Sequence, residues 1–343
     1  MLLLALALAA APLAAAPAPA PLRIVTSLTT YAAIAREVVG DRGTVTAIAR
    51  GDEDPHFVQP KPSFVALLRD ADLFVTTGLD LELWVPPLLD RASNRKVAEG
   101  GPGYVTAYTG ITLLEVPTSL DRAQGDIHAD GNPHIHTDPV NAIIIARNIL
   151  AGLKRVDPAG AAAYTTREGD FEQRILAATM GTELVQVLTP ATAYRLLAGN
   201  QLLDFLWKTP YQGAPLLTRL GGWLKTAEAF RGKDIACYHR EWAYFSNRFG
   251  VTCAQFIEAK PGIPPTPGHV MDVIGYMREH HIPVLFASNY FDRNQIRQVA
   301  EKTGATAVVV AENTDGAPDT ATYFQLMDSW VNGLAQAMRA GGH

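Results

Sequence analysis

The sequence has little of what marks several large classes of protein. It contains 2 cysteines among 343 residues, too few for a small scaffold held together by several disulfides. It has 29 Lys and Arg against 34 Asp and Glu, a net charge of -5. With no basic run, it offers no positive surface for nucleic acid or an anionic membrane. Its 48% hydrophobic and 18% charged residues exclude disorder of the whole chain and predict a globular protein long enough for two domains.

Long hydrophobic runs are also scarce, with one exception at the start of the chain. Residues 1–20 are an apolar Leu/Ala stretch that passes into Ala and Pro. The stretch is short and interrupted by Pro, which argues against a membrane span. We therefore expect residues 1–20 to be a signal peptide and the protein to act in the periplasm. No Cys lies in the processing region, so a lipoprotein anchor is not expected.

The rest of the chain alternates short apolar runs with helical patterns, as βα units around a parallel sheet do. This alternation occurs twice, with a continuous helical pattern between the two series. We predict an N-terminal α/β lobe at 21–157, a bridging helix at 158–188 and a C-terminal α/β lobe at 189–343. Strands are expected at 23–28, 45–48, 73–77, 234–238, 252–257, 284–287 and 307–310.

The two cysteines, Cys237 and Cys253, both lie in predicted strands of the second lobe. In an oxidising compartment they could form one disulfide, but two buried free thiols would suit a core equally well. Cys237 also stands two residues before His239, so a thiolate metal ligand is a third reading.

Three histidines occupy separate short motifs far apart along the chain. His56 follows Asp-Pro, His134 follows Asn-Pro, and His239 directly follows a predicted strand. Ligands of open parallel sheets lie beyond the carboxyl ends of the strands, which is where His239 is expected. Each histidine alone could be an ordinary loop or half-buried residue. Together, neutral imidazoles from separate segments would form a site suited to zinc.

These motifs resemble those of the zinc/manganese solute-binding proteins of ABC transporters, and the resemblance covers most of the chain after residue 22. It implies two α/β lobes bridged by a long, nearly rigid helix, with the metal in the cleft between the lobes. The motifs that carry it are Asp54-Pro55-His56, Gly78-Leu79-Asp80, Asn132-Pro133-His134, Tyr238-His239 and residues 258–265.

Carried over by position, the resemblance makes His56, His134 and His239 metal ligands, with His136 standing where the family usually has an aromatic residue. It also implies a carboxylate, or water, after the last strand of the second lobe. We take Asp315 as this fourth ligand, with Glu312 and Asp292 as alternatives. Three imidazoles and one carboxylate suit four-coordinate Zn²⁺, whereas Mn²⁺ prefers more oxygen ligands.

The expected function is therefore that of a periplasmic protein that captures zinc and delivers it to an ABC permease. We expect a monomer that acts as no enzyme and binds no nucleic acid. The loop 121–136 contains His128, His134 and His136; it could dock a periplasmic metal chaperone or be only a flexible loop at the cleft edge. The alternatives are a manganese-specific binding protein, a zinc-dependent hydrolase with an open fourth position, and an adhesin on the same scaffold.

Overall fold

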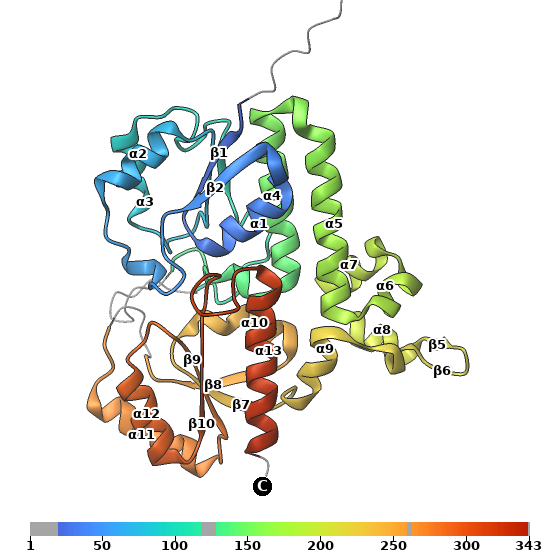
Figure 1. Cartoon of the computed structure of the whole chain (residues 1–343). Coiled ribbons are helices and arrows are strands. Elements are labelled where there is room, and N and C mark those ends of the chain that lie inside the picture. The colour runs from blue at the N-terminus through green and yellow to red at the C-terminus, as the bar shows by residue number, and fades with distance from the viewer. Residues whose placement is uncertain (1–19, 118–127, 259–262, 342–343) are drawn as a thin grey trace, which may run out of the picture.

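The computed structural model describes residues 20–117, 128–258 and 263–341. They form two α/β lobes, one above the other, with a long helix running beside them (Figure 1). The two lobes predicted from the sequence are thus confirmed. The predicted signal peptide, apart from residue 20, and residues 121–127 of the loop 121–136 lie outside the described residues. None of the described helices is long and apolar enough to cross a membrane.

The first lobe is built on a parallel sheet of strand order β2-β1-β3-β4. Apolar runs such as that of β3, in which every residue is buried, suit a sheet covered by helices on both faces. Helices α1 and α4 pack against the sheet and against each other. The strands are β1 (Leu22–Thr26), β2 (Gly43–Ala47), β3 (Leu73–Thr76) and β4 (Tyr104–Thr106), and the helices α1 (Thr29–Val39), α2 (Pro62–Asp70), α3 (Val85–Ala92) and α4 (Pro139–Val156).

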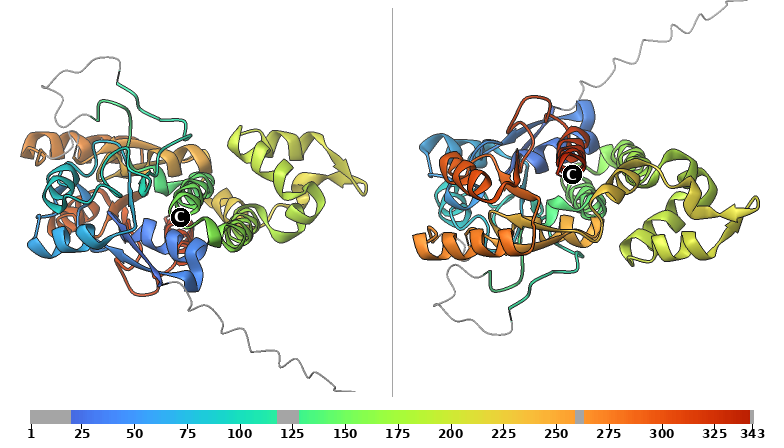
Figure 2. Two further views of the ribbon diagram at one scale, coloured as in Figure 1. Left: turned by 90° about the horizontal axis from the view of Figure 1, so that it is seen from above. Right: turned by 90° about the horizontal axis from the view of Figure 1, so that it is seen from below.

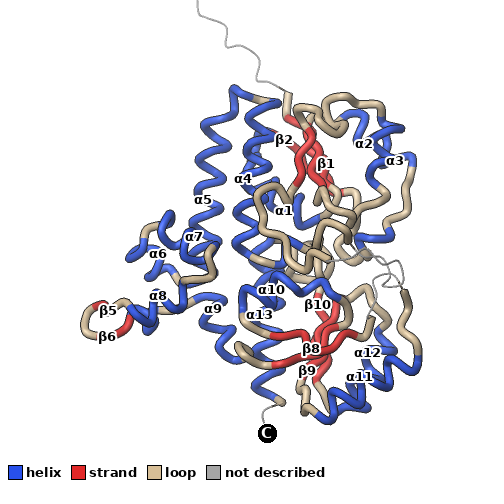
Figure 3. The backbone as a smooth tube through the Cα atoms, turned by 180° about the vertical axis from the view of Figure 1, so that it is seen from behind, coloured by secondary structure: helices blue, strands red, loops and turns tan. Residues whose placement is uncertain are grey.

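The second lobe repeats this design with a parallel sheet of order β10-β9-β7-β8. Figure 3 shows its strands below those of the first sheet. The strands are β7 (Asp234–Cys237), β8 (Thr252–Phe256), β9 (Val284–Ser288) and β10 (Thr306–Val310), and the helices α9 (Gly222–Thr226), α10 (Ala243–Phe249), α11 (Pro267–Glu279), α12 (Arg293–Thr303) and α13 (Tyr323–Ala340).

The bridging helix is shorter than the continuous helix predicted over 158–188. After a 3₁₀ turn, α5 runs from Ala161 to Met180, and a separate helix, α6 (Thr182–Leu188), follows Gly181. Gly181 has a φ of 94°, and a Cβ there would lie 2.9 Å from the Cα of Gly221. Only glycine allows both this conformation and this close backbone crossing. The continuous helix was therefore a wrong prediction, while the lobe boundaries at 157 and 188 stay predictions.

An arm projects sideways from the end of the bridging helix, as Figures 1 and 2 show from several directions. Leucines from its helices, among them Leu184, Leu197 and Leu206, are buried in the main core. Trp207, in contrast, is 65% exposed. The arm consists of α6, α7 (Pro190–Ala198), α8 (Leu202–Lys208) and a small hairpin of β5 (Pro210–Tyr211) and β6 (Ala214–Pro215).

Buried hydrogen bonds fasten the two lobes to each other. The hydroxyl of Thr29 donates to the carbonyl of Thr314 at 2.6 Å, and the hydroxyl of Thr30 donates to the Asn313 side chain at 2.7 Å. Gly51 packs so closely on this segment that a Cβ there would lie 2.0 Å from the Thr314 carbonyl oxygen. The loop after β10 is thereby held against the first lobe.

Cys237 and Cys253 form a disulfide between β7 and β8, with Cα atoms 5.5 Å apart. Of the three readings that the sequence left open, the structure has the disulfide. Both sulfurs are then bonded to each other, so neither is a thiolate ligand for a metal.

A buried ion pair also crosses between the lobes. Two guanidinium nitrogens of Arg248, in α10, each donate to one oxygen of Asp138 at 2.9 Å. The two side chains are only 6% and 4% exposed. Asp138 also caps α4 through the N–H of Val140. Arg248 further donates to the carbonyl of Leu197, so it connects the second lobe both to the first lobe and to the arm.

We expect Arg248→Met to destabilise the protein by about 3 kcal/mol, because it leaves the Asp138 carboxylate buried without its partner. The measurement is urea unfolding followed by circular dichroism. Arg297→Met is the matched control: Arg297 is exposed in α12, so its loss should change stability by less than about 0.5 kcal/mol. Equal stability of the two variants would contradict the role given to the buried pair.

Candidate metal centre

His56 is held in place by the residue two positions before it. Asp54 caps the 3₁₀ turn Pro55–Phe57, and its Oδ1 accepts the backbone N–H of His56 at 3.0 Å. The same oxygen lies 2.8 Å from the Nδ1 of the His56 ring. This contact holds the pKa of Asp54 below its usual value although burial acts in the opposite direction. The Trp84 indole anchors the turn through the carbonyl of Pro55 at 2.8 Å.

His134 is held in the same way, by the residue two positions before it, which here is the neutral Asn132. The Oδ1 of Asn132 accepts the backbone N–H of His134 and lies 3.0 Å from its Nδ1. Asn132 is itself fixed by the second lobe, since its side-chain amide donates to the carbonyl of Arg240 and its carbonyl accepts the Tyr244 hydroxyl. The repeated Asx-Pro-His pattern therefore has a local physical meaning: it fixes the ring and leaves Nε2 to face outward from the turn.

His239 comes from the other lobe, where it directly follows β7. Its Nδ1 lies 3.3 Å from a carboxylate oxygen of Glu258. Burial alone would lower the pKa of His239, but the contact with Glu258 and the nearby Glu241 raise it. In each of the three histidines a neighbouring oxygen thus lies beside Nδ1, which leaves Nε2 for another partner.

The three rings converge. One ligand nitrogen from each of His56, His134 and His239 lies within 4.8 Å of the others. All three Nε2 atoms are buried, and none has a hydrogen-bond partner among the described residues. A buried polar atom without a partner is costly, so this cluster points to a missing ligand that all three nitrogens share. Burial holds the pKa of His134 well below its usual value, so its ring is in the neutral, metal-binding form.

Of the three candidates for the fourth ligand, Glu312 and not Asp315 lies beside the Nε2 atoms of this cluster. Glu312 is fully buried, and its Oε1 lies 3.8 Å from the Nε2 of His134 and has no hydrogen-bond partner among the described residues. Its Oε2 accepts the Tyr290 hydroxyl at 2.7 Å. Burial, followed by the nearby Glu241, raises the pKa of Glu312 well above its usual value. A bound cation would offset both effects.

The other two candidates for the fourth ligand have different places in the structure. Asp315 is exposed in a turn with a φ of 59°, and its backbone N–H donates to the carbonyl of Thr320. Asp292 caps α12 by accepting the backbone N–H of Asn294 at 2.8 Å. The group of potential ligands found among the described residues holds the three histidines and no carboxylate, so the preference for Glu312 rests on its distance to His134.

His128 lies next to the cluster of three histidines, a position that the sequence did not predict. Its ring stacks on that of His56 with centroids 5.4 Å apart, and both of its nitrogens are buried with no hydrogen-bond partner in the part of the chain that the structure describes. Burial and the neighbouring His56 lower its pKa to about 3. The sequence showed a histidine in a loop but had no signal for this contact, because His128 is outside the Asx-Pro-His pattern.

His136, the remaining histidine of this loop, connects two segments of the chain through hydrogen bonds. Its Nε2 donates to the backbone carbonyl of Glu312 at 3.3 Å, and its own carbonyl accepts the Tyr323 hydroxyl at 2.9 Å. It thereby connects the loop of His134 to the segment that carries Glu312.

Comparisons with known proteins agree with this picture. The family model for the zinc-uptake complex component A, periplasmic, matches residues 24–184 and 216–337. Residues 185–215, which make up most of the arm, lie between the two matched segments. The chain is 25% identical to the iron-binding protein YfeA of Yersinia pestis, over 92% of this chain and 85% of that protein. It is 22% identical to the high-affinity zinc uptake system protein ZnuA of Bacillus subtilis, over 84% and 77%.

A third relative is the manganese-binding lipoprotein MntA of Halalkalibacterium halodurans, which is 24% identical over 92% of this chain and 89% of its own length. Among solved structures, a crystal structure of ZnuA superposes with a TM-score of 0.64 at 20% identity and covers 93% of this chain and 99% of that one. A periplasmic metal-binding protein from Candidatus Liberibacter asiaticus gives 0.62 at 18% identity, over 92% and 98%. These structures share the fold.

We expect Glu312→Gln to weaken zinc binding by at least about tenfold, or about 1.4 kcal/mol, because it removes the negative charge beside the imidazole cluster. Asp315→Asn is the matched control and should change the affinity by less than about twofold, since that side chain faces solvent. Competition against a chromophoric zinc chelator measures both. If Asp315→Asn weakened binding and Glu312→Gln did not, Asp315 rather than Glu312 would be the fourth ligand.

Proposed function

Because the chain belongs to the family of periplasmic zinc-uptake components, which are solute-binding proteins of metal ABC transporters, we propose that it captures zinc(II) in the periplasm and delivers it to an ABC permease. The observation that carries this proposal is the convergence of three buried imidazole nitrogens that have no hydrogen-bond partner among the residues described. The family of this chain is that of substrate-binding transport proteins, which favours a binding role over hydrolysis.

The choice of zinc rests on the donor set. The names of the relatives include zinc, manganese and iron, so family membership alone does not select the ion. Three imidazoles with one carboxylate provide four ligands of the kind that zinc takes in tetrahedral geometry. Manganese prefers a larger number of oxygen ligands. In this proposal His56, His134, His239 and Glu312 hold the ion.

The contacts of the ligands suggest how the ion is held and released. His56 and His134 come from the first lobe, and His239 and Glu312 from the second, so a change in lobe spacing would pull the ligand set apart. The hydrogen bonds and the ion pair between the lobes limit such a change. We propose that the protein acts as a monomer, that small shifts of the ligand loops admit the ion, and that docking on the permease promotes its release. A periplasmic chaperone that hands over the ion is a further partner in this proposal.

We expect His56→Ala, His134→Ala and His239→Ala each to weaken zinc binding by at least about a hundredfold, or about 2.7 kcal/mol, since each removes one of four ligands. Titration calorimetry measures the affinity. His280→Ala is the control, because His280 lies at the exposed end of α11, stacked on Tyr276. Wild-type affinity in all three ligand variants would refute the site.

We also expect protein purified from the periplasm without a histidine tag to contain zinc at one ion per chain, because the described residues form one such ligand group. Elemental analysis by mass spectrometry measures the content. Manganese or iron at the same stoichiometry would keep the binding site but overturn the choice of metal.

A further inference from the structure

The second sheet ends in a strand whose outer edge is open. In the order β10-β9-β7-β8, β10 is an outer strand, and β9 is its one partner among the described strands. An unpaired strand edge carries a row of backbone donors and acceptors that another extended segment can use.

The hydrogen bonds with β9 show which groups face outward. Thr306 donates its N–H to Pro283, and the carbonyl of Val310 accepts the N–H of Asn289. In a parallel ladder the two backbone groups of a residue point to the same side, and the side alternates along the strand. The N–H and C=O groups of Ala307 and Val309 therefore point away from β9. No described residue bonds to the N–H of either one.

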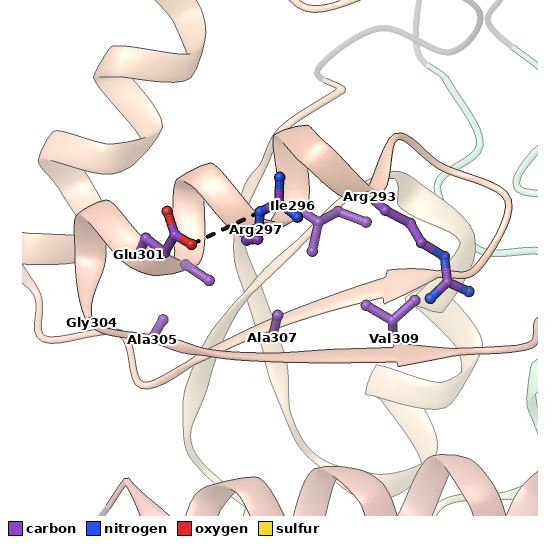
Figure 4. Close-up of a pocket in the computed structure, with 9 residues that line it drawn as sticks. Arg293, Ile296, Arg297, Glu301, Gly304, Ala305, Ala307 and Val309 are labelled. Atoms are coloured by element: carbon purple, nitrogen blue, oxygen red, sulfur yellow. Dashed lines mark ion pairs between the residues drawn. The ribbon is translucent and has the colours of Figure 1, made fainter.

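A groove lies over these same residues. It has a volume of about 390 Å³ and runs between β10 and α12. Figure 4 shows the small side chains of β10 along its floor and the side chains of α12 along its wall. Arg293, Ile296 and Arg297 belong to the wall, and Ala305, Ala307 and Val309 belong to the floor. A chain placed along this edge would thus meet backbone partners and have room for its side chains.

The wall of the groove carries two arginines and one glutamate, Glu301, and so has an excess of positive charge. Arg293 and Arg297 are both exposed. Arg297 lies 3.9 Å from Glu301, a long contact between exposed groups, whereas Arg293 forms no ion pair with any described residue. Exposed arginines beside a groove favour carboxylates in whatever occupies it.

We propose that the groove between α12 and β10 is a docking site for an extended acidic segment of another protein, which adds to the second sheet beside β10. Backbone hydrogen bonds to Ala307 and Val309 hold the segment, its apolar side chains lie over the small residues of the floor, and its carboxylates pair with Arg293 and Arg297. This docking is independent of which metal the protein carries.

The probe is a soluble peptide, acetyl-Val-Asp-Val-Glu-Val-Asp-Val-amide, added to full-length protein labelled with ¹⁵N on alanine and valine. We expect the largest amide shifts at Ala307 and Val309, saturating below about 1 mM, the weak end of specific binding. Two control peptides separate the contributions. One has lysine in place of the acidic residues, and the other has N-methyl groups that block its backbone donors; both should bind at least about tenfold more weakly.

Variants of the protein test the same contacts. The double variant Arg293→Glu, Arg297→Glu should weaken binding of the acidic peptide by at least about tenfold. Ala307→Pro should do so as well, because it removes an outward N–H and leaves the bonds with β9 in place. Arg91→Glu, on an exposed position of α3, should leave peptide binding unchanged. Unaltered zinc stoichiometry and circular dichroism show that each variant is folded.

Three results would overturn the proposal. The first is an absence of shifts at β10 with the acidic peptide. The second is equal binding of the acidic, lysine and N-methylated peptides. The third is self-association of the protein that occupies this edge, seen as a dimer in sedimentation that Ala307→Pro dissociates; a second copy of the chain would then be the occupant.

Discussion

The structure is organised around three buried imidazole nitrogens that have no hydrogen-bond partner in the described part of the chain. Leaving such an atom without a hydrogen bond costs about 1–3 kcal/mol, and His56, His134 and His239 place three of these atoms together. Their rings cannot turn away to find other partners, because Asp54, Asn132 and Glu258 lie beside the opposite nitrogens. In the proposed function, the site is thus prepared for a cation before the cation arrives, and binding would replace the missing contacts.

The two-lobed architecture provides this arrangement by bringing the carboxyl ends of two parallel sheets together. His56 and His134 follow strands of one sheet, and His239 and Glu312 follow strands of the other. Each lobe alone therefore carries half of the proposed ligand set. The lobes are fastened by the pairs Thr30–Asn313 and Arg248–Asp138, which are buried and would be costly to break. These contacts oppose a large closure of the two lobes around the ion, so we expect the loops that carry the ligands to move instead.

Two features of the structure lie outside the cluster of histidines. The arm of α6–α8 corresponds largely to residues that the family model does not match, and it exposes Trp207. The open edge of β10 lies on the second lobe, with a positive groove beside it. Neither feature supplies a proposed ligand. The proposed metal site and the proposed docking groove therefore use different surfaces, which would allow the groove to change without altering the metal site.

Local features were readable from the sequence by itself. The βα alternation depends on short-range apolar periodicity, so it predicted the two lobes that the structure shows. The Asx-Pro-His motifs marked His56 and His134, and the structure shows that each motif works through a contact between residues two apart. Long-range contacts were not readable. The helix ends at Gly181 because Gly221, forty residues later, crosses it. Glu312 rather than Asp315 lies by the histidines because the chain turns outward at Asp315 with a left-handed φ. His128 reaches His56, and Cys237 pairs with Cys253, only through the packing of separate segments. The sequence determined the local geometry of the His56 and His134 imidazoles, because their Nδ1 partners are two residues away. The tertiary structure decided the Nδ1 partner of His239 and which groups meet all three rings, since that depends on the direction of the chain after each strand.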